Sequence, residues 1–367
     1  MYSKLKMEGI MVIKYFMKLY NKEHEIIDEL YLLSDISYTK TLNGIGNMEF
    51  KTPIRYLSEK GIELTLGQHI ELYKIVKGVE HLLWFGVINS PSPSSNDINC
   101  LCLGYAYLLQ NRNFTKIELN SDNEWKKSYL SKKYGDLIFT LINYINTTYD
   151  TGIQTGILKE TVLETDRIIN WNDDLYDKIQ EFIEDSKCYF VIDKDRRFNF
   201  YDEIGEDKSE YYEINDYNII GSWDYSIDQT EIFNVINARV VYKDGDITNI
   251  LISSKKDYES IKRYGYREKA LSVNDIKLQE TLDKQVEEEL NTYKEPLVSC
   301  NCEIGINDTF NIFDIEPGDY IKLNSEVNNI DIKIRVLEYK VDLKKNTVKI
   351  SLGNAIFREN KPKIYRY

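Results

Sequence analysis

Short apolar-polar alternations separated by turns dominate the first hundred or so residues and predict an antiparallel β-region. Strand-like runs such as HIELYKI, LLWFGVINSP and INCLCLGYAYLL follow one another with polar breaks between them. We expect Asn43, Gly44 and Gly46 to supply the positive φ that a turn requires. Pro53 is placed to end the strand that contains Phe50.

The pattern changes to helix and strand between residues 121 and 215. Asn172 or Asp173 is a suitable N-cap for the second of two helices, and the stretch YFVIDKDRRFNFYDE predicts two strands around a Lys194–Asp195 turn. A small α/β unit is therefore expected. The helices are predicted from apolar side chains at helical spacing: Leu137, Leu141 and Ile145 in the first, and Leu175, Ile179, Phe182 and Ile183 in the second.

A second β-region begins near Ile219 and is interrupted by one helix. Alternating residues on both sides of an Asp244–Gly245 turn predict a hairpin. Strands return after Pro296, and the last of them follow a Pro-Gly-Asp turn in the stretch FDIEPGDYIKL. The intervening helix, in VNDIKLQETLDKQVEEELNTYKEP, is predicted from an apolar face of Leu278, Leu282, Val286 and Leu290.

Length and charge narrow the possible functions. A chain of 367 residues and 43.3 kDa is longer than one ordinary core, so two to four compact units are expected. Asp and Glu number 60 against 47 Lys and Arg, a formal net charge of −13 with both signs interspersed. This balance argues against a nucleic-acid groove built from a dense cationic patch. The 29 tyrosines favour half-buried surfaces of the kind found in interfaces.

The sequence shows neither a targeting signal nor a membrane span. The opening MYSKLKMEGIMVIKYFMKLYNKEHE mixes charges and lacks an uninterrupted apolar core, and no later run reaches the roughly 18 apolar residues of a membrane helix. A soluble, cytosolic-type chain is expected. The periodic pattern begins only near Met11, so residues 1–10 are assigned no structural role.

Five cysteines raise the question of a metal or redox site. Cys100/Cys102 and Cys300/Cys302 form two C-x-C pairs, whereas zinc sites usually use C-x2-C or histidine partners at compatible spacing. The three histidines, His24, His69 and His81, have no such motif around them. In a strand, C-x-C places both sulfurs on one face, where cysteine packs as a small apolar residue. Buried strand cysteines are the prediction, with a metal or redox site as the alternative.

The search for catalytic motifs is negative. The sequence contains no phosphate-binding glycine loop, no dinucleotide-binding glycine motif, no HExxH and no GxSxG. Adjacent carboxylates such as Asp173/Asp174 are common in a chain with 60 acids, so they are best interpreted as solvated, although residue type alone leaves a glycosidase open. The stretch DKDRRFNFYDE lacks the Gly at position 6 and the Glu at position 12 that a calcium loop requires.

The four tryptophans could belong to a core or stack on a sugar. Trp84 lies in the apolar run LLWFGVI, which favours the core, and Trp171 is placed as a hydrophobic staple at a helix start. Trp125 and Trp223 complete the set, and the sequence does not group the four into one platform.

Four segments, taken in order, resemble the tail-hub proteins of tailed phages and phage-tail-like particles, a group that includes many prophage proteins. LNGIGNMEFKTP is similar to that family's early strand-turn-strand. LWFGVINSP…INCLCLGYAYLLQNR resembles its aromatic-x-Gly-x-Ile strand, variable hairpin and Leu-rich segment, which closes here on Arg112. IFNVINARVVYKDG is similar to the first strand of its second barrel. IEPGDYIKL…VLEYKVDLKKNTVKISLGN resembles its terminal turn and closing strands.

The resemblance covers residues 11–357 and implies an α+β, β-rich fold with two tail-tube-like antiparallel β-barrel domains. In that architecture the Pro-Gly-Asp strand helps to close the second barrel, which removes an exposed sheet edge. The implied layout is a first barrel domain over 11–110, an α/β domain over 111–215, a second barrel domain over 216–260 and 297–360, and a helical insertion over 261–296.

The resemblance also implies a structural function with no catalytic, cofactor-binding or metal site. Three copies of the chain would form a pseudo-sixfold ring that joins the tail tube to the central spike or tail tip of a virion or phage-tail-like particle. The implied partners are a homotrimer mate, a tube protein and a spike or tail-tip protein, made in the bacterial cytoplasm. No specific nucleic-acid binding is expected, although an acidic lumen would let DNA slide through.

Two other functions stay open at this point. A carbohydrate-binding tail adhesin would be supported by exposed Trp and Tyr side chains on one outer face. A tail-associated cell-wall hydrolase would need a degrading domain after the hub, and the sequence ends at Tyr367, a few residues past VKISLGN, where we expect no room for one. Whether the particle is contractile, non-contractile or a defective prophage is not indicated by the sequence.

Overall fold

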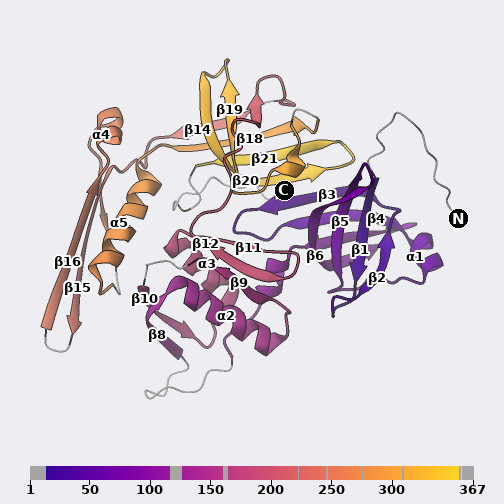
Figure 1. Ribbon diagram of the computed structural model, residues 1–367, viewed down its shortest axis with the longest axis horizontal. Coiled ribbons are helices and arrows are strands. Elements are labelled where there is room, and N and C mark those ends of the chain that lie inside the picture. Colours follow the sequence, from indigo (N-terminus) through magenta and orange to yellow (C-terminus); the bar gives the residue numbers. More distant parts are fainter. Residues whose placement is uncertain are drawn as a thin grey trace. The chain divides into compact units, whose positions relative to one another are not determined.

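The chain folds into two compact units (Figure 1). The first unit contains residues up to 40 together with 45–107 and 340–348, and the second contains 41–44, 108–339 and the residues from 349 on. None of the described helices combines the length and apolar character needed to cross a membrane. The computed structural model describes residues 14–115, 126–159, 164–221, 223–244, 247–273, 276–307, 310–354 and 357.

The first unit is built on an antiparallel sheet, as its alternating sequence predicts. Its strands are β1 Lys14–Tyr20, β2 Ile26–Leu30, β3 Ser34–Thr41, β4 Asn47–Pro53, β5 His69–Val76, β6 Val79–Pro93 and β7 Asp97–Leu103. They pair in the order β3-β4-β7-β6-β5-β1-β2. Met17 and Leu72 are fully buried among them. Pro53 ends β4 as predicted, and the short helix α1, Ile54–Lys60, follows it directly.

The turn between β3 and β4 uses its glycines differently from the prediction. Asn43 has a positive φ of 54°, but neither Gly44 nor Gly46 does. A Cβ atom on Gly46 would lie 2.4 Å from the Thr39 carbonyl oxygen, and one on Gly44 would lie 2.8 Å from Cγ2 of Thr41. These two positions therefore need glycine for close approach of the chain to itself.

The α/β part of the second unit contains both helices that the sequence predicts. Its elements are β8 Lys126–Lys133, α2 Tyr134–Tyr149, β9 Gln154–Leu158, β10 Glu164–Asn170, α3 Leu175–Ser186, β11 Tyr189–Ile192 and β12 Arg197–Tyr201. Strands β8 and β10 pair antiparallel, whereas β12 lies between β11, its antiparallel partner, and β9, its parallel partner. Leu141 on α2 and Phe182 on α3 are buried on the predicted apolar faces.

The N-cap of α3 is Asp174, so the prediction of Asn172 or Asp173 was wrong. The Asp174 carboxylate accepts a hydrogen bond from the backbone N–H of Tyr176 at 2.9 Å. The Asp173 carboxylate instead accepts from the N–H of Asn170 at 2.8 Å and stabilises the turn before the helix. Three capping-type residues stand in a row here, and the preceding turn decides which one reaches the helix.

A mixed sheet contains the closing strands. Its elements are β13 Glu213–Asn215, β14 Asp224–Asp228, β18 Leu297–Gly305, the 3-10 turn η2 Ile312–Asp314, β19 Tyr320–Ser325, β20 Ile330–Asp342 and β21 Thr347–Gly353. The strands pair in the order β14-β18-β21-β20-β19-β13, with β13 parallel to β19. Because β13 occupies the second side of β19, neither edge of the Pro-Gly-Asp strand is left unpaired.

A hairpin and a helix between β14 and β18 pack as a separate group of the second unit (Figure 1). Its elements are β15 Val235–Asp244, β16 Ile247–Lys256, α4 Tyr258–Tyr264, β17 Glu268–Leu271 and α5 Gln279–Tyr293. The predicted hairpin is confirmed, although Gly245 lies outside the described residues. On α5, Leu282, Val286 and Leu290 are buried as predicted. Leu278 is 49% exposed because it is the N-cap and precedes the first helical turn.

Candidate functional site

The Pro-Gly-Asp turn holds a buried carboxylate. Asp319, only 2% exposed, accepts hydrogen bonds from the backbone N–H groups of Glu206 and Glu316, each at 2.8 Å. The Lys208 ammonium donates to the same carboxylate, also at 2.8 Å. Gly318 has a φ of 109°, a value that a side chain rarely permits. The turn therefore presents Asp319 to a segment more than a hundred residues earlier in the chain.

This carboxylate organises the edge of the closing sheet. Residues 206–208 run beside the start of β19, where the N–H of Tyr320 donates to the Glu206 carbonyl at 2.9 Å and the Lys208 N–H donates to the Tyr320 carbonyl at 2.8 Å. The segment that contains residues 206–208 leads on to β13, which pairs with β19. A Cβ on Gly205 would lie 2.1 Å from the Gly318 carbonyl oxygen, so the two loops pack backbone to backbone. The role of the turn is to dock one segment onto another.

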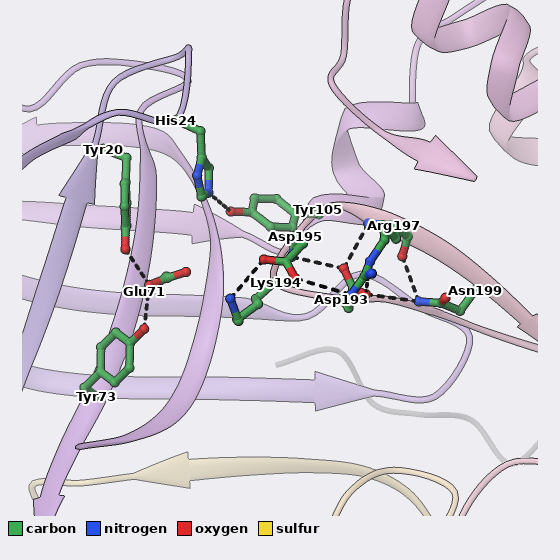
Figure 2. A network of polar contacts seen from close by, with 10 residues as sticks. All are labelled: Tyr20, His24, Glu71, Tyr73, Tyr105, Asp193, Lys194, Asp195, Arg197 and Asn199. Atoms are coloured by element: carbon green, nitrogen blue, oxygen red, sulfur yellow. Dashed lines mark hydrogen bonds and ion pairs between the residues drawn. The ribbon is translucent and has the colours of Figure 1, made fainter. Parts of the chain in front are cut away.

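A second buried carboxylate lies in the first unit, on β5 next to its partner strand β1 (Figure 2). Glu71 is 3% exposed, and its Oε2 accepts hydrogen bonds from the hydroxyls of Tyr20 and Tyr73, each at 2.7 Å. Burial, and then the hydrogen bond to Glu71, raise the pKa of both tyrosines well above its ordinary value. Lys18 lies 4.5 Å from the centre of the Tyr73 ring. The group is a fixed polar contact between neighbouring strands.

Two of the three histidines come together in the first unit, which the sequence did not predict. The Tyr105 hydroxyl, in the 3-10 turn η1 Tyr105–Leu109, lies 3.3 Å from Nδ1 of His69 and 3.4 Å from Nε2 of His24. Figure 2 shows the His24–Tyr105 contact. The two imidazole rings are 5.0 Å apart in an edge-on arrangement. Within the described part of the chain, no three His, Cys, Asp or Glu side chains are placed to hold a metal ion.

The acidic hairpin between β11 and β12 uses its carboxylates internally (Figure 2). Oδ1 of Asp193 accepts from the backbone N–H groups of Asp195 and Arg197, each at 3.0 Å. Oδ2 of Asp193 pairs with Nε of Arg197 at 2.9 Å, and Lys194 pairs with Asp195. Because these oxygens bind the turn's own amides and cations, the turn has no resemblance to a calcium loop beyond its composition.

All five cysteines are buried free thiols, and the four cysteines of the two C-x-C pairs lie in strands as predicted. Cys100 and Cys102 lie on β7, and Cys300 and Cys302 on β18. Burial raises the pKa of Cys100 and of Cys188 to about 12 and raises the pKa of Cys102 as well. A thiol held protonated in this way is a poor nucleophile and a poor metal ligand.

The described tryptophans occupy different surroundings. Trp84 is 3% exposed and donates from its indole N–H to the Thr39 carbonyl at 3.2 Å, which confirms its assignment to the core. Trp171 is 49% exposed and precedes the N-cap of α3 by three residues, and Trp223 is partly buried. Trp125 lies outside the described residues.

Sequence reasoning missed the two buried carboxylates and the histidine pair for a common reason. Glu71 and Asp319 are each an ordinary acid in a chain rich in acids, and each binds one partner far away in the sequence, Tyr20 and Glu206 respectively. One signal was present: Glu71 stands directly between the apolar residues Ile70 and Leu72 of HIELYKI.

The fold that carries these networks is that of prophage tail proteins. A solved prophage tail protein, gp18 of Listeria monocytogenes, is 15% identical and matches with a TM-score of 0.59 over 93% of this chain and 94% of its own. The 43 kDa tail protein of prophage MuSo2 from Shewanella oneidensis is 11% identical, with a TM-score of 0.56 over 93% and 98% of the two chains. A structure of the Francisella PdpA–VgrG complex is 11% identical and matches with a TM-score of 0.51 over 93% of this chain and 52% of that chain.

The sequence itself identifies the family. A family model with the description Prophage endopeptidase tail matches residues 105–358, and the chain belongs to this family. The resemblance to phage tail-hub proteins noted in the four sequence motifs is thereby confirmed. Curated protein sequences offer no significant match.

Proposed function

We propose that the chain is the structural hub of a phage tail or phage-tail-like particle. Three copies form a pseudo-sixfold ring that joins the tail tube on one side to the central spike or tail tip on the other. In this role the protein adapts a sixfold tube to a threefold spike, and the work is done by interfaces between subunits rather than by a reaction.

The proposal is supported mainly by one observation: the family match of the sequence and the fold match of the structure both point to prophage tail proteins. The family model covers residues 105–358, and the fold match to two prophage tail proteins extends over 93% of the chain. A hub also needs a spike-side partner, and one of the matched structures is a complex of PdpA with VgrG. The buried carboxylates described above fit this role, because each fixes a strand or a loop within a sheet.

The proposal includes the domain layout expected from the sequence. The antiparallel sheet of the first unit supplies the first tube-like barrel, over 11–110, and the closing strands supply the second, over 216–260 and 297–360. Within 216–260, β14 pairs with the closing strands, whereas the β15–β16 hairpin pairs with β17. The α/β domain over 111–215 lies outside the ring, and 261–296 is a helical insertion. Pairing of β19 on both sides, by β20 and β13, supports the view that the closing sheet leaves its Pro-Gly-Asp strand without an open edge.

The solution mass tests the ring. Light scattering on the purified chain across a dilution series should show a stable species near three times 43.3 kDa, and negative-stain images should show rings. A chain that stays monomeric at every concentration, alone and with the tube protein of the same particle, contradicts the hub proposal. A glycan-binding screen then tests the adhesin alternative.

The family description gives a reason to test a second function. It contains the word endopeptidase, so a cell-wall hydrolase is the competing proposal. Incubation of the pure chain with purified peptidoglycan, followed by detection of newly released amino groups, separates the two. The hub proposal expects no release above a heat-denatured control. Release that depends on folded protein would favour the hydrolase.

A further inference from the structure

The β15–β16 hairpin has one covered face and one exposed face. Helix α5 packs on the first, where Ile236 and Val240 are buried against it (Figure 1). The other face carries Val241, Ile250 and Ile252, which are 53%, 51% and 66% exposed. Of the two faces, the second is the one open to a partner.

These three side chains form one continuous patch. Val241 and Ile250 are directly opposite each other in the antiparallel register. Directly opposed residues share a face and have neighbouring Cβ atoms, and Ile252 follows Ile250 on that face two residues later. Single exposed apolar residues are common on protein surfaces, whereas three adjacent β-branched residues on a strand pair form a patch of the kind that marks interaction sites.

Two cations flank the patch. Arg239 and Lys243 lie two residues before and after Val241 on β15, so they share its face. Neither cation forms an ion pair with any other described residue. A matching surface must therefore offer carboxylates as well as apolar area.

The face, rather than the strand edge, is the available surface. The outer edge of β16 is partly blocked, because the side-chain amide of Gln279 donates to the Ile252 carbonyl at 3.0 Å. Addition of a partner strand at that edge would have to displace this bond.

We propose that this face docks against an acidic surface on a second copy of the chain. The proposal rests on the hub function, which places identical subunits side by side. With 60 acidic against 47 basic residues, a second copy offers the required carboxylates. Pairing of the face with itself would oppose Arg239 and Lys243 to their own copies. The contact is therefore head to tail, the type of interface that closes into a ring.

Charge-introducing variants of the full chain test the interface. The double variant Ile250→Glu/Ile252→Glu places carboxylates against the acidic surface, and Arg239→Glu/Lys243→Glu reverses the flanking charge. Val79→Glu is the matched control, since Val79 is a 57% exposed strand residue of the first unit. Circular dichroism and thermal unfolding confirm that each variant is folded. Light scattering then gives the mass across a dilution series.

Both double variants should raise the concentration for half-assembly at least tenfold, while Val79→Glu leaves it unchanged. The effect of the charge reversal should shrink in high salt. A trimer that survives both double variants overturns the interface and leaves the hub function standing. A wild-type assembly of other than three copies, broken by the same variants, supports the interface and contradicts the ring. A wild type that stays monomeric at every concentration, alone and with the tube protein of the same particle, contradicts both.

One further outcome would reassign the face. If short duplex DNA binds the wild-type chain and Arg239→Glu/Lys243→Glu abolishes that binding without changing the assembly, the cations contact a nucleic acid and the subunit interface is overturned.

Discussion

Replacing Asp319 by alanine should weaken the second unit by removing one buried carboxylate. The substitution eliminates three hydrogen bonds, from the N–H groups of Glu206 and Glu316 and from the Lys208 ammonium. Each lost backbone bond costs about 1 kcal/mol. The Lys208 side chain is 21% exposed and can turn towards water, so its share is also about 1 kcal/mol. We expect a total loss of about 3 kcal/mol in the free energy of unfolding.

The conservative variant Asp319→Asn refines the expectation. Its amide oxygen can still accept from the Glu206 N–H, but its NH2 group cannot replace the oxygen that accepts from Glu316 and Lys208. The loss should be about two thirds of that of alanine. Asp331→Asn is the control, because Asp331 is 70% exposed in its ion pair with Lys322, and surface pairs contribute little.

Urea unfolding measures the predicted loss of stability, and hydrogen exchange measures whether the segment before β13 has detached from β19. The unfolding midpoint gives the change in free energy if the slope of the transition is unchanged. Exchange of peptides covering residues 204–212 reports whether that segment has left β19. A loss below about 1 kcal/mol, with protection of 204–212 unaltered, would refute the view that Asp319 docks the segment.

Three further predictions concern other residues. The hydrogen bond from Lys344 lowers the pKa of Asp35 from its ordinary 3.8 to about 2. Wild type should therefore have a higher melting temperature than Asp35→Asn at pH 5, and this difference in melting temperature should disappear as the pH falls from 4 to 2. Gly46→Ala should destabilise the first unit by about 1–3 kcal/mol in urea unfolding, whereas Gly305→Ala, which meets only an ordinary contact at 3.9 Å, should have little effect on its own unit. Cys102 should resist a thiol reagent until the chain is unfolded, and rapid native labelling would contradict its burial.

Elements with a long regular pattern could be predicted from the sequence, and short ones could not. The helices α2, α3 and α5 each repeat an apolar face over several turns. The helices α1 and α4 have seven residues each, which is too few for a periodic signal to differ from chance. Their positions depend on the strands around them.

The polar networks show a second limit of sequence reasoning. Tyr20 and Glu71 are 51 positions apart, and His24 and Tyr105 are 81 apart, so no local window contains either pair. The strand register of β1 with β5 brings Tyr20 and Glu71 close, and that register is a property of the whole sheet.

The Pro-Gly-Asp turn shows both what a local motif predicts and what depends on distant contacts. A local motif was enough to predict the turn and the strand β19 after it, since Pro and Gly restrict the backbone at adjacent positions. The same turn in another chain could leave its carboxylate in water. Here the carboxylate binds Glu206, 113 positions earlier, and this contact brings β13 to the edge of β19. The structural role of the motif therefore depends on its distant partner. Substitutions at Gly205 should destabilise the second unit as much as substitutions within the turn, because Gly205 packs directly on the Gly318 backbone.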